Sequence, residues 1–314
     1  MESLRYFGPV PSRRLGRSLG INNIPPKICS YSCVYCQLGR SLSMVNQRGE
    51  YFDPEELGKE VLDGIQSLRE ENEHIDYLTI VPDGEPTLDI NLGKLIDILK
   101  TSGIKIAVIT NSTLLDDPSV RHDLSKADLV SIKVDSVIEK TWKKIDRPYG
   151  RIKLGSILDG IRKFTEGYDG KVFTETMLVK DLNDDIENSR KTADFLASID
   201  PDRSYLSIPT RPPAENWVAP PPLENINTAF QIFKEAGLTV EYLIGYEGNE
   251  FAFTGNIEQD ILSITSVHPM RADAIEEFLL KAGGEMRIID DMVLKGSLVA
   301  LDYQNKRFYL RNLK

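Results

Sequence analysis

Short apolar runs alternate with amphipathic stretches from about residue 17 to residue 243. The apolar runs predict six strands over residues 18–24, 75–81, 104–110, 128–134, 171–179 and 204–208. The amphipathic stretches predict helices over residues 54–70, 91–102, 152–166, 183–198 and 223–236. This alternation is typical of βαβ units with a parallel sheet. Right-handed crossovers would curl six such units into a partial or full barrel, with the chemistry at the carboxyl ends of the strands.

The pattern changes twice towards the C-terminus. A proline-rich stretch over residues 209–222 follows the last predicted strand, and we expect an ordered loop over the barrel mouth. After Gly255 the periodicity predicts three helices and two short strands over residues 257–264, 271–281, 285–295, 297–303 and 307–313. Three helices followed by a hairpin is the order of a winged helix. We therefore expect a barrel domain over residues 1–255 and a small winged-helix-like α+β domain over residues 256–314.

The charge of this second unit bears on its role. Residues 257–296 carry four basic and eight acidic side chains, whereas residues 297–314 carry four basic and one acidic. A helix that reads DNA needs positive charge, so the balance favours a module that docks protein or substrate over a DNA reader.

Composition narrows the class of protein. The chain has 314 residues, of which 41% are hydrophobic and 27% charged, as in an ordinary globular protein. It lacks both an apolar run long enough to span a membrane and a secretory signal pattern, so we expect a cytoplasmic protein with no membrane partner. The net charge of −10 disfavours a general nucleic-acid coat. Residues 1–48 depart from this acidic character, with seven basic residues and one acid.

All three cysteines lie within eight residues, at Cys29, Cys33 and Cys36. An odd, local cluster is not a disulfide framework, so it indicates a metal or iron–sulfur site. Structural zinc takes four ligands, and the histidines are distant in sequence. A four-iron cluster also commonly takes four cysteines, so three would leave one iron open, as in a catalytic metal centre.

The C-x3-C-x2-C spacing, with Tyr35 before the last cysteine, resembles the radical S-adenosylmethionine superfamily. Residues 8–245 are similar to the partial (β/α)6 barrel of that superfamily. The sequence around the motif further resembles the iron–sulfur oxidoreductases akin to wyosine-type tRNA-modifying enzymes. Those enzymes, however, carry further cysteines for a second cluster. The resemblance implies a [4Fe–4S] cluster on the three cysteines. It also implies reductive cleavage of S-adenosylmethionine to a 5′-deoxyadenosyl radical, which abstracts hydrogen from a substrate.

Polar residues after the predicted strands are candidate contacts to S-adenosylmethionine. The sequence Asp83-Gly84-Glu85-Pro86 resembles the Gly-Gly-Glu-Pro motif of the superfamily, which implies contact with the methionine amino group. Asn111 follows the next strand, where a cap or turn role is equally expected.

Three further strand ends supply candidates. The resemblance places Asp135 and Ser136 against the ribose hydroxyls, and Lys133 on the same strand face could reach the carboxylate of the cofactor or the substrate. Glu175 is a candidate contact because a carboxylate inside a barrel is costly without a function. Nine cofactor-site candidates, counting Tyr35, therefore precede the last strand end. That end adds two more, Ile208 and Arg211, for adenine packing and for a carboxylate or phosphate.

The basic N-terminal region surrounds the cysteine motif and admits three interpretations. It could dock an acidic electron donor such as a flavodoxin or ferredoxin, or bind a phosphate-bearing substrate. Alternatively, Arg13 and Arg14 pair with acids elsewhere in the chain.

The sequence thus favours a radical S-adenosylmethionine oxidoreductase or transferase, with tRNA, a peptide or a small molecule as candidate substrate. Two other functions stay open. One is a redox-sensing winged-helix regulator that binds DNA, and the other is a zinc-stabilised structural protein.

Overall fold

The computed structural model describes residues 5–312 apart from residues 245–250, 252, 254 and 268. Its central sheet has eight strands in the order β1-β2-β5-β6-β7-β8-β9-β10. These strands are β1 (Tyr6–Ser12), β2 (Gly16–Ile21), β5 (Tyr77–Ile80), β6 (Lys105–Thr110), β7 (Leu129–Lys133), β8 (Lys171–Met177), β9 (Arg203–Ser207) and β10 (Val240–Leu243). Strand β1 is antiparallel to β2, and every pair from β2 to β10 is parallel.

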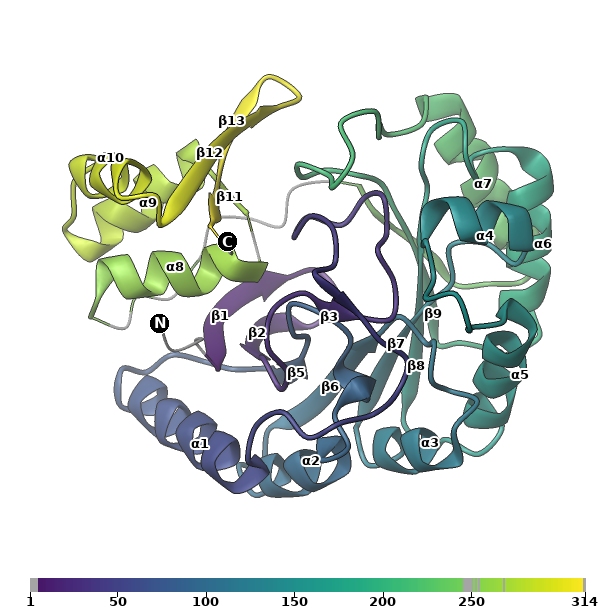
Figure 1. The fold of residues 1–314 in the computed structure, drawn as a ribbon, viewed down its shortest axis with the longest axis horizontal. Coiled ribbons are helices and arrows are strands. Elements are labelled where there is room, and N and C mark those ends of the chain that lie inside the picture. The colour runs from purple at the N-terminus through teal and green to yellow at the C-terminus, as the bar shows by residue number, and fades with distance from the viewer. Residues whose placement is uncertain (1–4, 245–250, 252, 254, 268, 313–314) are drawn as a thin grey trace.

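Helices cover the outside of the curved sheet (Figure 1). They are α1 (Pro54–Glu70), η1 (Pro86–Leu88), α2 (Leu92–Lys100), α3 (Pro118–Leu124), α4 (Glu139–Ile145), α5 (Leu154–Thr165), α6 (Ile186–Ala197) and α7 (Leu223–Glu235). The six predicted strands correspond to β2 and β5–β9, so the partial barrel is confirmed. No helix within the described residues has the length and apolar character that a membrane crossing requires.

The two faces of the sheet bury different side chains. Alternate positions of the strands pack outward against the helices in the main core, whereas their neighbours face the barrel interior. There Leu15, from the turn between β1 and β2, packs with Ala107, Leu129, Phe173 and Tyr205. This small apolar cluster closes the barrel at the end where β2 begins and leaves the other end for the site.

The C-terminal unit contains α8 (Ile257–Val267), β11 (Met270–Arg271), α9 (Ala272–Ala282), α10 (Arg287–Leu294), β12 (Leu298–Tyr303) and β13 (Lys306–Arg311). Its sheet has the order β11-β13-β12, and its element order is the predicted winged-helix order with one added short strand. The unit lies beside β1 (Figure 1), whose Phe7 and Val10 share an apolar cluster with Ile261 and Ile275. Because this core is continuous with the barrel edge, the division at residue 255 stays a prediction.

Candidate active site

The three cysteines lie in the loop after β2, here called the cysteine loop (residues 27–45). Its ends are joined where β3 (Ile28–Cys29) pairs with β4 (Ser43–Met44). Between them, the Cys36 N–H donates to the Cys33 carbonyl at 3.1 Å. All three cysteines are partly exposed.

Backbone hydrogen bonds join the cysteine loop to the turn after β5. Lys27 N–H donates to the Asp83 carbonyl at 2.6 Å, and Glu85 N–H donates to the Ile28 carbonyl at 3.1 Å. A Cβ on Gly84 would lie 2.0 Å from the Ile28 carbonyl oxygen. Only glycine permits this approach, so the two motifs recognised in the sequence form one structural unit.

Glu85 is fully enclosed and holds two strand ends together. Its carboxylate accepts hydrogen bonds from the Thr87 and Thr110 hydroxyls, both at 2.6 Å, and from the Asn111 N–H at 2.7 Å. The Asn111 side chain in turn donates to Cys29 Sγ at 3.5 Å. These contacts make Glu85 a positioning group and place Asn111 beside the first cysteine.

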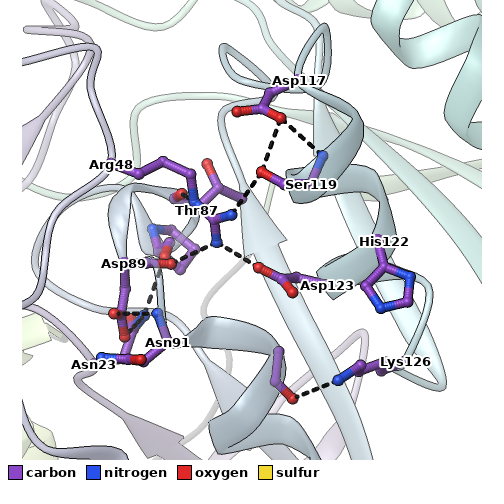
Figure 2. A network of polar contacts seen from close by, with 12 residues as sticks. Asn23, Arg48, Thr87, Asp89, Asn91, Asp117, Ser119, His122, Asp123 and Lys126 are labelled. Atoms are coloured by element: carbon purple, nitrogen blue, oxygen red, sulfur yellow. Dashed lines mark hydrogen bonds and ion pairs between the residues drawn. The ribbon is translucent and has the colours of Figure 1, made fainter.

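Arg48, which follows the cysteine loop, fixes the same turn from the outside (Figure 2). Its guanidinium donates to the Thr87 carbonyl at 3.2 Å, to the Asp89 carbonyl at 2.7 Å and to the Ser119 hydroxyl at 2.9 Å. It also forms an ion pair with Asp123. Arg48 therefore has a structural role, which its place in a basic N-terminal region did not reveal.

A buried polar network lies behind the cysteines. The Tyr35 hydroxyl donates to Asp135 and also lies 3.2 Å from Asp146 Oδ1. Cys33 Sγ lies 3.5 Å from the same Asp146 oxygen, and Lys133 Nζ lies 4.6 Å from the centre of the Tyr35 ring. Burial, and then the neighbouring Asp135, raise the pKa of Asp146 well above its usual range. No sequence motif pointed to Asp146.

The Ser136 side chain forms hydrogen bonds with residues outside this network. Its hydroxyl donates to the Asn188 side chain at 2.9 Å and accepts the Ile138 N–H at 3.0 Å. Its predicted contact with ribose stays a prediction.

A cavity of about 330 Å³ opens beside Cys36. It is lined by Arg13, Arg14, Tyr35, Cys36, Gln37, Leu38, Val81, Gly84, Lys133, Glu175, Met177, Ser207, Ile208, Pro209, Thr210, Arg211 and Leu243. Six of the eleven predicted cofactor residues are in this lining: Tyr35, Gly84, Lys133, Glu175, Ile208 and Arg211. The other five, Asp83, Glu85, Asn111, Asp135 and Ser136, are outside it.

Glu175 lies in the wall of this cavity between two cations. It forms ion pairs with Arg14 and, at 3.8 Å, with Lys133, and it accepts a hydrogen bond from the Ser207 hydroxyl at 3.0 Å. Although burial raises the pKa of Glu175, Arg14 and Lys133 lower it more, to about 2. The carboxylate is therefore ionised at neutral pH. Arg14 escaped sequence reasoning because it approaches Glu175 only through the turn between β1 and β2.

Ion pairs account for much of the basic N-terminal region. Cations of this region form ion pairs with acids that are distant in the sequence: Arg5, Arg14, Arg17, Arg40 and Arg48. The expected pairing with an acid elsewhere is thus confirmed for Arg14, and four further cations of the region pair in the same way. The pairs reduce the positive potential available to an electron donor, whose docking stays a prediction.

Asp83 is the departure from the Gly-Gly-Glu-Pro pattern. Its side chain is 2% exposed, and its Oδ1 has no hydrogen-bond partner among the described residues. Burial raises its pKa to about 7, against the opposing effect of Arg311 and Lys27. A buried acceptor without a donor is costly, so this atom is suited to a cationic or hydrogen-bonding ligand.

The arrangement of the cysteines fits a cluster better than a single metal ion. Among the described residues, no three Cys, His, Asp or Glu side chains converge as ligands of one ion. Ligands of a four-iron cluster each bind a different iron and need not converge. Burial raises the pKa of the Cys29 thiol to about 12, so loading of iron must displace thiol protons.

Comparison with known proteins agrees with this site. The model of the family described as the radical SAM superfamily matches residues 23–193. The chain belongs to this superfamily of enzymes. Membership implies a [4Fe–4S] cluster and S-adenosylmethionine as cofactors.

Individual relatives add detail on fold but none on substrate. The chain is 49% identical to the UPF0026 protein MJ1312 of Methanocaldococcus jannaschii over 98% of this chain and 96% of that protein. A radical SAM methyltransferase from Sphaerobacter thermophilus has 16% identity and a TM-score of 0.55, over 72% of this chain and 66% of that chain. A structure of TYW1 with a lysine-pyruvate adduct bound reaches a TM-score of 0.45 at 14% identity, over 94% of this chain and 80% of that chain. The kinship with wyosine-type enzymes stays a prediction.

Proposed function

We propose that this chain is a radical S-adenosylmethionine oxidoreductase or transferase that holds a [4Fe–4S] cluster on Cys29, Cys33 and Cys36. The cluster and S-adenosylmethionine, when bound, supply a 5′-deoxyadenosyl radical that abstracts hydrogen from a substrate. The observation that carries the proposal is the position of Cys36 in the wall of a cavity lined from several strand ends. An open iron next to Cys36 would therefore face the cavity.

Asp83 and Gly84 would receive the amino group of S-adenosylmethionine. Gly84 lines the cavity, and the adjacent Asp83 supplies a buried carboxylate oxygen without a partner. A carboxylate is a strong acceptor for an ammonium group. Lys133 would take the cofactor carboxylate, while Ile208 gives the adenine an apolar wall.

Other residues would hold the site rather than touch the cofactor. The Tyr35 hydroxyl fixes the cysteine loop to Asp135, whose second oxygen accepts the Met177 N–H at 2.8 Å. Glu85 fixes the ends of β5 and β6 in the same way. These contacts place the cysteine loop and the cavity walls in one rigid arrangement.

For the substrate and the electron donor, we propose only the class of molecule. A tRNA, a peptide or a small molecule would enter the cavity, and an acidic flavodoxin or ferredoxin would supply the electron. Against the DNA-binding alternative, Asp290 and Asp291 lie on the exposed face of α10, the helix in the recognition position. Two carboxylates there would repel phosphate.

Electron paramagnetic resonance of the anaerobically reconstituted, dithionite-reduced protein tests the proposal. We expect a reduced four-iron signal whose shape changes when S-adenosylmethionine is added. A protein that takes up zinc in place of iron, or a signal indifferent to S-adenosylmethionine, would contradict it.

A further inference from the structure

The cavity beside Cys36 has the opposite charge to the whole protein. The chain carries a net charge of −10. The cavity lining nevertheless contains four cations, Arg13, Arg14, Lys133 and Arg211, and one carboxylate, Glu175. Positive charge in a concave site raises the local concentration of anions.

Internal ion pairs engage the cations of the cavity wall but leave one donor of Arg14 unused among the described residues. Glu175 is shared by Arg14 and Lys133, and Asp135 and Asp146 also act on Lys133. The Arg14 Nε is buried and has no hydrogen-bond partner among the described residues. An N–H donor of this kind beside a cavity is suited to an anionic ligand.

Arg211 also lines the cavity, from the loop after β9. Its guanidinium donates to Gln37 Oε1 at 2.8 Å, which holds it beside the cysteine loop. The carbonyl of Pro209, two residues earlier, accepts the Tyr303 hydroxyl at 3.0 Å and the Gln304 amide at 3.4 Å. These hydrogen bonds hold the segment that carries Arg211 against the turn between β12 and β13. The C-terminal unit therefore helps to position Arg211 at the cavity.

We infer that the substrate presents an oxyanion, a carboxylate or a phosphate, to Arg211 within the field of Arg13 and Arg14. The inference rests on the proposed function, because it assigns Lys133 to the single carboxylate of S-adenosylmethionine. With Lys133 assigned to the cofactor, Arg13, Arg14 and Arg211 are the cations of the lining that this assignment does not use.

Calorimetric titration of the full-length, cluster-loaded protein at low ionic strength tests this inference. Inorganic pyrophosphate and glutarate are the probes for the phosphate and carboxylate sources, each titrated with and without saturating S-adenosylmethionine. We expect one probe to bind in both conditions, and the preferred probe identifies the source. Arg211→Gln should weaken its binding about tenfold or more, since a charge-assisted hydrogen bond is lost.

Two variants sharpen the result. Glu175→Gln should tighten probe binding, because it removes the carboxylate that competes for Arg14. Arg151→Gln removes an exposed arginine outside this cavity and should bind like the wild type.

The inference is overturned if neither probe binds, if Arg211→Gln binds like Arg151→Gln, or if S-adenosylmethionine abolishes probe binding by competition. The last outcome would show that the cations serve the cofactor carboxylate. Failure of the proposed function is separate: it would appear as loss of cofactor cleavage while probe binding without S-adenosylmethionine persists.

Discussion

Arg14 and Glu175 are separated by 161 positions in the sequence and form an ion pair in the barrel interior. The contact joins the turn between β1 and β2 to the middle of β8. It also holds the one carboxylate of the cavity lining in its charged form.

Replacing Arg14 should change how stability depends on pH. Folding lowers the pKa of Glu175 from 4.5 to about 2. The ionised Glu175 therefore stabilises the folded protein above pH 4.5, and this stabilisation is lost as the pH falls through 2. The effect is at most about 3 kcal/mol. Arg14→Met should unfold more easily at pH 7 and lose less stability between pH 5 and pH 2, as measured by urea unfolding.

The matched control is Arg203→Met, which breaks the exposed pair with Glu241. It should cost less than about 1 kcal/mol. Identical pH profiles for Arg14→Met and the wild type would contradict the assigned pairing.

Asp83→Asn should stabilise the metal-free protein at high pH and weaken cofactor binding. Burial raises the pKa of Asp83 from 3.8 to about 7, so the folded state binds the proton more tightly than the unfolded state. Stability therefore falls as the pH rises from about 4 to 7 in the wild type, by at most about 4 kcal/mol. In thermal unfolding, the variant should have a higher unfolding temperature than the wild type at pH 8 and the same unfolding temperature near pH 4.

The same variant should bind S-adenosylmethionine about tenfold more weakly, since a charged acceptor is lost. Asp169→Asn, at an exposed position, is the control for both measurements. A variant that is less stable at pH 8 and binds the cofactor normally would refute the role given to Asp83.

Gly84→Ala should disturb the junction between the cysteine loop and the turn after β5. The added Cβ would lie 2.0 Å from the Ile28 carbonyl oxygen, and backbone atoms on both sides must move. We expect a loss of about 2 kcal/mol or more in unfolding free energy and less iron bound per chain after reconstitution. Gly155→Ala meets nothing within 4 Å and should be neutral or slightly stabilising. Normal iron loading of Gly84→Ala would contradict the account.

Arg48→Ala tests the structural role seen in Figure 2. It leaves Asp123 and two backbone carbonyls without their donor, which should cost about 3–5 kcal/mol, as for other broken buried pairs. Lys191→Ala, which removes the exposed pair with Glu187, should cost about 0.5 kcal/mol or less in the same urea titration. Equal losses for the two variants would show that Arg48 is not a structural clamp.

The sequence predicted those elements whose signals are local. Helix α1 begins and ends where expected because the Asp53 side chain caps it and Pro54 occupies its first turn. Strand β1 was missed because Pro9 and Pro11 argue against a strand, yet it lies at the sheet edge, where proline is tolerated. Short helices α3 and α4, with seven residues each, lack the length that periodicity needs.

The residues of the site also divide into those that local sequence signals predict and those that only the tertiary structure reveals. The cysteines, Gly84 and the residues at strand ends could be predicted because a motif and a register place them. Arg14 and Asp146 could not, since each reaches the site through a tertiary contact distant in sequence. Glu85 was recognised from its motif, but only its hydrogen bonds reveal that it joins two strands.

The most direct test of the account is an assay for 5′-deoxyadenosine after anaerobic reconstitution with iron and sulfide and incubation with S-adenosylmethionine and dithionite. We predict its formation by the wild type and by Ser43→Ala, an exposed change in the same loop, and its loss in Cys33→Ala. A wild-type protein that carries about four irons per chain but yields no 5′-deoxyadenosine, or a Cys33→Ala variant that yields as much as the wild type, would contradict the central claim.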